Sequence, residues 1–289
     1  MRRLRRTIRA MVSEAIPDVQ WIETHTAEEA RVAAAEAGAG DTVVAAGGDG
    51  TVHVTLMGLA RSGFRAGLGI IPVGTGNDFA HAMGLPAGPQ PAIQSIARGE
   101  STQVDLGWVR IDDGQEEPFL NAVGAGFDAA ASIRSRTWRF LPGLARYLVA
   151  TMHTLAVWRS PEATVNGQAW SGSMMFGTIG NGARSGGAFL ITPDADPCDG
   201  VFQACLVDHL PALTAMRVIP RVIEGSHRSI PAVTLAEGTE FLIGCPAGLP
   251  VHADGEILAR SATRVACRIE PGRLRFVGSR RTNPTSLSD

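Results

Sequence analysis

The chain has 289 residues, of which 45% are hydrophobic and 19% charged, so it can bury a core large enough for one large domain or two smaller ones. A formal net charge of −2 gives no overall attraction to nucleic acid, and we exclude a nucleic-acid partner. The four cysteines have neither disulfide nor zinc-finger spacing, and no apolar run is long enough to span a membrane, which favours a cytoplasmic protein.

The first hundred residues alternate between helical and strand patterns. Thr26 and Glu29 have the spacing of a capping box, which predicts a helix over residues 26–37. Other helices are predicted over residues 4–15 and from Val52 and Gly76 onward, and strands over residues 19–24, 41–46 and 67–72. This order predicts an α/β domain over residues 1–104, with a parallel sheet and helices on its faces.

Beyond Asp105, short apolar runs alternate with pairs such as Asn166-Gly167, Asp254-Gly255 and Pro271-Gly272. These pairs are typical of turns between antiparallel strands, and one helical stretch interrupts them around residues 139–157. We therefore predict an all-β antiparallel sandwich over residues 105–277, followed by a disordered tail over residues 278–289.

Two glycine-rich loops follow the predicted strands 41–46 and 67–72: Gly47-Gly48-Asp49-Gly50-Thr51 and Gly74-Thr75-Gly76-Asn77-Asp78. Glycines let the backbone approach a phosphate, and the N-terminus of the following helix supplies N–H groups. Asp49 would repel a phosphate, so we interpret it as holding Mg²⁺ or water, or as accepting a donor of the nucleotide. Two unrelated tight turns are the alternative, but neither turn needs its Asp.

Together with later segments, these loops resemble the bacterial diacylglycerol kinase catalytic-domain family, relatives of the sphingosine and ceramide kinases. The resemblance covers nearly the whole chain and rests on GGDGT, PVGTGNDFA, Phe119-Leu120-Asn121, Gly126-Phe127-Asp128, Gly180-Asn181-Gly182 and Asp254-Gly255-Glu256. It implies an α/β domain like those of phosphofructokinases and NAD kinases, ATP and Mg²⁺ as cofactors, and transfer of phosphate to a lipid hydroxyl. Diacylglycerol is the first candidate for the acceptor, and a sphingoid base, ceramide or phosphatidylglycerol stays open.

The resemblance also implies roles for individual residues. The implied ATP contacts are Thr24, Gly47, Gly48, Asp49, Gly50, Thr51, Val52, His53, Thr75, Asn77 and Asp78. The implied general base is Glu256, with Asp254 beside it, and a structural Mg²⁺ site is implied at Asp199 with the backbone carbonyls of Asp196 and Val201. Without the resemblance, Asp254-Gly255-Glu256 would indicate only a hairpin turn followed by a solvent-facing glutamate.

Two features depart from the family pattern. The family begins with a strand and an Asn-Pro-x-Ser/Ala-Gly loop, whereas this chain begins in the helix that would follow, so we expect the true start to lie upstream of Met1. After GGDGT the family usually has x-Asn-Glu, where this chain has His53 and Val54 at the last two places. A weakened kinase or a non-catalytic nucleotide- or lipid-binding relic therefore stays open.

The lipid acceptor implies contact with a membrane surface. We expect a cytoplasmic protein that docks peripherally, through the arginine-rich first helix or through the Trp138 to Tyr147 segment with its nearby arginines. The sequence leaves homodimer formation open.

Overall fold

The computed structural model describes residues 2–86, 88–135, 137 and 143–278, and these form two compact units. Unit 1 consists of the chain up to Asp105 together with the segment that begins at Gly272, and unit 2 consists of Leu106–Pro271. No helix among the described residues has the length and hydrophobicity needed to cross a membrane. Most of the predicted Trp138 to Tyr147 docking patch lies outside the residues whose side chains are described.

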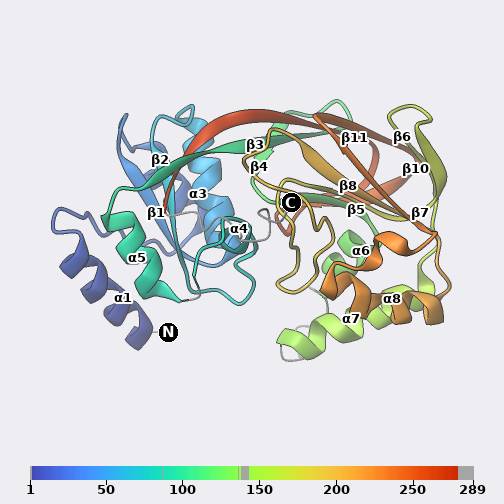
Figure 1. Cartoon of the computed structure of the whole chain (residues 1–289), viewed down its shortest axis with the longest axis horizontal. Helices are drawn as coiled ribbons and strands as arrows, with labels where there is room; N and C mark the ends of the chain where they lie inside the picture. Colours follow the sequence, from blue (N-terminus) through green and yellow to red (C-terminus); the bar gives the residue numbers. More distant parts are fainter. Residues whose placement is uncertain (1, 87, 136, 138–142, 279–289) are drawn as a thin grey trace, which may run out of the picture. The chain divides into compact units, whose positions relative to one another are not determined.

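Unit 1 contains a parallel sheet with helices around it (Figure 1). Its elements are α1 (Arg2–Ala15), α2 (Ala27–Ala35), β1 (Thr42–Gly47), α3 (Asp49–Arg61), β2 (Gly67–Pro72), α4 (Asp78–Ala82), α5 (Pro89–Ala97) and the start of β3 (Ser101–Ile111). The last residues of β11 (Glu256–Val277) add a further strand, because Phe276 and Val277 pair in parallel with Leu68 and Gly69 of β2. β1 pairs in parallel along the whole length of β2.

The chain enters this sheet at Gly272, a position where the sequence predicts a turn. β11 continues through Pro271-Gly272 instead, so the prediction of a hairpin turn there is wrong. Gly272 has a φ of 59°, and its N–H donates to the Asp105 carboxylate at 2.7 Å. Glycine tolerates this left-handed conformation, which bends the strand without ending it.

The predicted strand over residues 19–24 is also absent, since this segment has no regular structure. In the described part of the chain β1 pairs only with β2, so the segment has no strand to bond with. A segment with alternating hydrophobicity does not form a strand without a neighbouring strand, because its backbone N–H and C=O groups need hydrogen-bond partners. The core of unit 1 lies between α1, α5 and β2, where Ile8 and Val12 pack with Ile71, Ile93 and Ile96.

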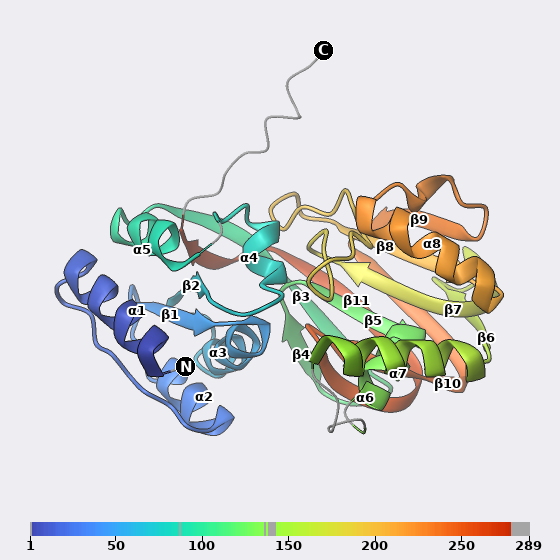
Figure 2. The same cartoon turned by 90° about the horizontal axis from the view of Figure 1, so that it is seen from below.

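Unit 2 is an antiparallel sheet with helices on one face. Its strands are the rest of β3, β4 (Glu116–Phe119), β5 (Ala122–Gly126), β6 (Glu162–Val165), β7 (Trp170–Gly180), β8 (Phe202–Asp208), β9 (Val233–Gly238), β10 (Glu240–Ala253) and the first part of β11. Neighbouring strands follow the order β11-β10-β5-β7-β8-β9, while β6 pairs with β10 and β7, and β3 with β4 and β11. Figure 2 shows α6 (Phe127–Ser135), α7 (Gly143–Val157) and α8 (Ala212–Glu224) over this sheet. The prediction of a single helical stretch was wrong, since α6 and α8 were not foreseen.

Candidate functional site

The two glycine-rich loops of unit 1 contact each other at the ends of β1 and β2. A Cβ atom on Gly74 would lie 2.4 Å from the Cα of Gly48, so only glycine fits this approach. The Asp49 carboxylate joins the loops, because it accepts the N–H groups of Asn77 at 2.8 Å and Asp78 at 2.6 Å. Asn77 in turn holds Gly74 through its side-chain amide, which bonds both the N–H and the C=O of that residue.

These bonds give Asp49 a structural task that the sequence did not suggest. Its charge faces two backbone donors at the start of α4, an arrangement that favours a carboxylate over any neutral side chain. Asn77 adopts a left-handed backbone with φ of 54°, which turns the chain into that helix. Asp49 and Asn77 thus hold the second loop in a fixed shape.

The N-terminus of α3 lies at the first loop. Gly48 is its N-cap and provides no side-chain acceptor, and its carbonyl accepts the N–H groups of Thr51 at 2.9 Å and Val52 at 3.1 Å. The N–H groups that an anion would meet at this helix end are therefore those of Asp49 and Gly50. Gly50 and Thr51 are exposed there, and a Cβ on Gly50 would meet nothing within 4 Å. Val52 and His53, each 6% exposed, point into the core, so a ligand could reach them only through their backbone.

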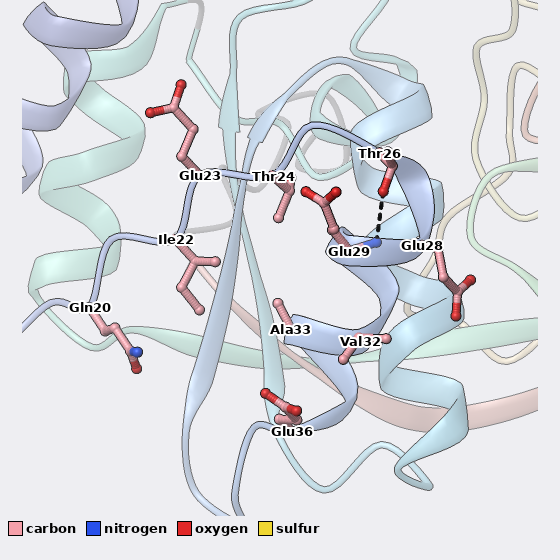
Figure 3. A pocket seen from close by; sticks show the side chains of 10 residues that line it. All are labelled: Gln20, Ile22, Glu23, Thr24, Thr26, Glu28, Glu29, Val32, Ala33 and Glu36. Atoms are coloured by element: carbon pink, nitrogen blue, oxygen red, sulfur yellow. Dashed lines mark hydrogen bonds between the residues drawn. The ribbon is translucent and has the colours of Figure 1, made fainter.

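Thr24 lies apart from these loops in the structure. It lines a pocket of about 610 Å³ formed by the 20–24 segment and α2, and neither loop contributes a residue to that pocket (Figure 3). Thr26 caps α2 by accepting the N–H of Glu29 at 3.1 Å, as predicted, while the Glu29 carboxylate accepts the N–H of His25 at 2.7 Å. Because Glu23, Glu28, Glu29 and Glu36 also line the pocket, it is a poor place for a phosphate.

In unit 2, Asp254 and Gly255 form the two-residue turn between β10 and β11, with φ of 49° and 85°. The Asp254 carboxylate accepts three backbone N–H groups, those of Leu120 at 2.9 Å, Asn121 at 2.9 Å and Ala122 at 3.1 Å. Glu256 follows as the first residue of β11 and is exposed. Asp254 therefore binds the turn to the backbone at the start of β5, and Glu256 lies next to the turn on the surface.

Several polar residues below this turn received no role from the sequence. His252 Nε2 lies 3.0 Å from Asp128 Oδ2, and a Cβ on Gly124 would collide with both side chains. Asn181 Nδ2 donates to the Leu120 carbonyl at 2.7 Å, which supports the same backbone that Asp254 holds. Asp128 and Asn181 belong to the Gly-Phe-Asp and Gly-Asn-Gly segments that carry the family resemblance, and that was the only available signal for them.

The pKa of His252 lies above its usual value. Burial alone would lower the pKa, but the hydrogen bond and charge of Asp128 and the charge of Asp254 together outweigh burial. The pair is nearly buried, with side chains 10% and 19% exposed. His252 and Asp128 thus form a charge-assisted bond beneath the Asp254 turn.

The proposed metal ligands lie in a tight turn before β8. Asp199 Oδ1 accepts the N–H of Val201 at 3.0 Å, and the Asp196 carbonyl accepts the N–H of Asp199 at 3.3 Å. The described residues contain no group of three or more His, Cys, Asp or Glu side chains that could hold a metal. A carboxylate with two backbone carbonyls is still a set of hard oxygen donors, which suits Mg²⁺ because this ion keeps several of its waters.

Comparison with known proteins assigns both halves of the chain. Residues 1–109 match the family model of the diacylglycerol kinase catalytic domain, and residues 121–278 match that of the YegS C-terminal NAD kinase beta sandwich-like domain. The diacylglycerol kinase of Mycobacterium tuberculosis is 33% identical over 245 residues, which cover 83% of this chain and 78% of that protein. The diacylglycerol kinase of Bacillus subtilis is 29% identical over 238 residues, which cover 81% and 75%.

The fold is shared with solved structures. A diacylglycerol kinase from Bacillus anthracis superposes with a TM-score of 0.67 at 22% identity, covering 96% of this chain and 89% of that one. The chain therefore belongs to the bacterial diacylglycerol kinase and YegS-like family of lipid kinases.

Proposed function

We propose that this protein is an ATP-dependent kinase that transfers a phosphate to the hydroxyl of a membrane lipid, with diacylglycerol as the first candidate. The observation that carries the proposal is the pair of glycine loops joined by the Asp49 carboxylate at the ends of two parallel strands. Phosphate groups bind where glycine backbone and a helix N-terminus come together.

ATP would bind unit 1 mainly through backbone groups. The contacts we propose are Gly47, Gly48, Asp49, Gly50, Thr51, Val52, His53, Thr75, Asn77 and Asp78, with Thr24 as a more distant contact. Val52, His53 and Asp78 are buried, so they would act by shaping the loops. Mg²⁺ would offset negative charge on the phosphates, as in other phosphoryl transfers, and a separate structural Mg²⁺ would sit on Asp199 with the carbonyls of Asp196 and Val201.

Glu256 would accept the proton of the attacking hydroxyl. It is exposed and follows a turn whose backbone Asp254 holds against the rest of unit 2, so a substrate can reach its carboxylate. Asp254 has a different part in this proposal. Its oxygens already accept three backbone N–H groups, so it would position Glu256 and leave the proton transfer to that residue.

A small apolar cavity in unit 2 has room for the end of a lipid acyl chain. The cavity, of about 90 Å³, lies between α7, α8 and the sheet, and its lining includes Leu155, Phe176 and Val218. Its two titratable residues are uncharged near neutral pH: burial, with some help from Asp128, raises the pKa of Cys205 to about 12, and burial lowers the pKa of His227. An acyl chain would therefore meet no charge there.

The proposal is tested by incubating the protein with labelled ATP and a panel of dispersed lipids: diacylglycerol, sphingosine, ceramide and phosphatidylglycerol. We expect label in phosphatidic acid, and we expect Glu256→Gln to lower kcat about 100-fold or more with little change in ATP affinity. Glu237→Gln, which changes an exposed carboxylate on β9, is the matched control and should retain full turnover.

Three other outcomes would change the proposal. Label in a different lipid would replace diacylglycerol as the acceptor but retain the kinase. Binding of ATP without transfer to any lipid would favour the non-catalytic relic that Val54 leaves open. Full turnover by Glu256→Gln would remove Glu256 from the mechanism.

A further inference from the structure

Helix α8 has one buried face and one apolar exposed face. Ala215, Val218, Ile219 and Val222 point inward and line the cavity of unit 2. On the outside, Leu213 is 71% exposed, Met216 43% and Ile223 44%. These three residues and the exposed Pro220 follow helical spacing, so they form one apolar stripe along the solvent side.

Arginines lie beside this stripe. Arg217 and Arg221 are both exposed and one turn apart, so they share the neighbouring strip of the same helix. Within the described residues neither arginine forms an ion pair. The outward face of α8 thus combines an apolar stripe with two arginines, and the helix itself contains one acidic residue, Glu224.

Helix α7 extends the apolar area. Val149 is 37% exposed, Met152 45% and Val157 52%, whereas Thr151 and Leu155 of the same helix line the cavity. Both helices cover the same face of the unit 2 sheet (Figures 1 and 2), so their outward sides point the same way. Six of the nine large hydrophobic side chains that are exposed in the described chain belong to these two helices.

We propose that this surface, the α7–α8 face, docks on an anionic lipid bilayer. We define it by its exposed residues: Val149, Met152, Val157, Leu213, Met216, Ile223, Arg217 and Arg221. The inference rests on the proposed function, which needs a lipid that resides in a membrane. It names a surface that the sequence did not single out, since α8 itself was not predicted.

A bilayer fits this surface better than another protein does. A helix with an apolar stripe and a basic flank lies in the plane of a membrane interface, with apolar side chains among the acyl chains and arginines at the headgroups. Each arginine gains free energy near an anionic surface, and the α7–α8 face has two without acidic partners. The net charge of −2 gives no overall attraction to an anionic surface, so docking would depend on a local patch.

The test is co-sedimentation of the full chain with vesicles of phosphatidylcholine alone or mixed with phosphatidylglycerol, in the absence of ATP. We expect binding only to the mixed vesicles, and weaker binding at higher salt. Arg217→Gln/Arg221→Gln should weaken binding about 10- to 30-fold, and Leu213→Gln/Met216→Gln by a similar factor. Arg3→Gln/Arg6→Gln on α1 makes the same charge change elsewhere on the exposed surface and should bind like wild type.

A second measurement separates docking from catalysis. Phosphorylation of a short-chain diacylglycerol in detergent-free solution needs no bilayer, so the α8 variants should retain wild-type turnover on it. Loss of this turnover together with a lower unfolding temperature would mean that the variants are misfolded, and Leu213→Ala/Met216→Ala would then replace them. Vesicle binding without any kinase activity would overturn the proposed function and leave docking intact.

Two results would overturn the docking proposal itself. Normal binding by both folded α8 variants would exclude the α7–α8 face. Loss of binding in Arg3→Gln/Arg6→Gln alone would assign docking to α1.

Discussion

At the scale of single residues, the two glycine-rich loops are held together by contacts among their own residues. Gly48, Asp49 and Asn77 were predicted as ATP contacts, and in the structure they contact one another or Gly74 of the second loop. The sequence could not show this, because the two loops are separated along the chain and their contact depends on the pairing of β1 with β2. The loops can therefore be tested first as a rigid assembly.

Gly74→Ala should disrupt this assembly. The new Cβ would lie 2.4 Å from Gly48 Cα, and both partners are backbone, so the loops must move apart. We expect a loss of about 1 to 3 kcal/mol in the free energy of unfolding, together with weaker ATP binding. Thermal unfolding and calorimetric titration with ATP measure the two effects.

Gly50→Ala is the matched control for stability, because its Cβ would enter open space in the same region. It should leave the unfolding temperature unchanged or slightly raise it. Wild-type stability and ATP affinity in Gly74→Ala would refute the close packing of the two loops.

The pair of His252 and Asp128 predicts a pH dependence. Because the folded pKa of His252 is raised, protonated His252 stabilises the fold fully below the unfolded pKa of about 6.5, and this contribution is lost as pH rises through the folded value. Asp128→Asn removes the main cause of the shift. The wild type should thus be more stable than Asp128→Asn by about 1 to 3 kcal/mol at pH near 6, with a smaller difference near pH 9.

Denaturant unfolding of both proteins across that pH range measures the difference. Asp112→Asn is a suitable control, because hydrogen bonds from Thr263 and Arg264 lower the pKa of Asp112. The contribution of Asp112 to the free energy of unfolding therefore changes only at acid pH. A gap between wild type and Asp128→Asn that stays constant from about pH 6 to 9 would contradict the role of His252.

At the scale of elements, the sequence predicted correctly those helices, strands and turns that depend on neighbouring residues in the chain. The apolar runs 41–46 and 67–72 correspond to β1 and β2, the Thr26 cap starts α2, and Asp254-Gly255 forms a two-residue hairpin turn. Helix α8 was missed because Pro211 precedes it and Pro220 lies inside it, and proline is expected to end a helix. Pro220 is tolerated there since it lies on the exposed side, where water can bond the carbonyl that loses its partner.

The turn before β8 carries the element-scale prediction. If this turn holds a divalent cation, Mg²⁺ should raise the unfolding temperature of the wild type, because an ion that binds only the folded state stabilises it. Asp199→Asn keeps an oxygen that can accept the N–H of Val201 but removes the charge, so it should lose the response to Mg²⁺.

Thermal unfolding with and without Mg²⁺ gives the answer, with Asp113→Asn, at an exposed turn, as the control that should still respond. An equal response in wild type and Asp199→Asn would show that the cation binds elsewhere. No response in either protein would leave the turn with a purely structural role.

At the scale of the whole molecule, the two units do not simply follow each other along the chain. Unit 1 starts at the N-terminus but takes its last strand from the other end of the chain, as β11 passes Gly272. Local motifs carry the family resemblance, whereas no local pattern indicates which distant strand a given strand pairs with. For this reason the sequence predicted a turn at Pro271-Gly272, where β11 in fact continues.

Phe276→Ala tests this arrangement. Phe276 is 0% exposed, pairs with Leu68 of β2, and packs edge to face on Phe79 with ring centroids 6.0 Å apart. Its removal should destabilise unit 1 by about 3 to 5 kcal/mol, although the residue lies near the end of the chain. Hydrogen exchange resolved by peptide should then show faster exchange in β1 and β2, while β7 and β8 of unit 2 stay protected.

Ile179→Ala is the reciprocal control, because Ile179 is equally buried in the core of unit 2 and lies on β7. It should loosen β7 and β8 and leave β1 and β2 protected. If Phe276→Ala instead raises exchange in unit 2 alone, the end of β11 belongs to unit 2 and the parallel pairing with β2 is wrong. Equal loss in both units from either variant would mean that the two units unfold as one cooperative structure.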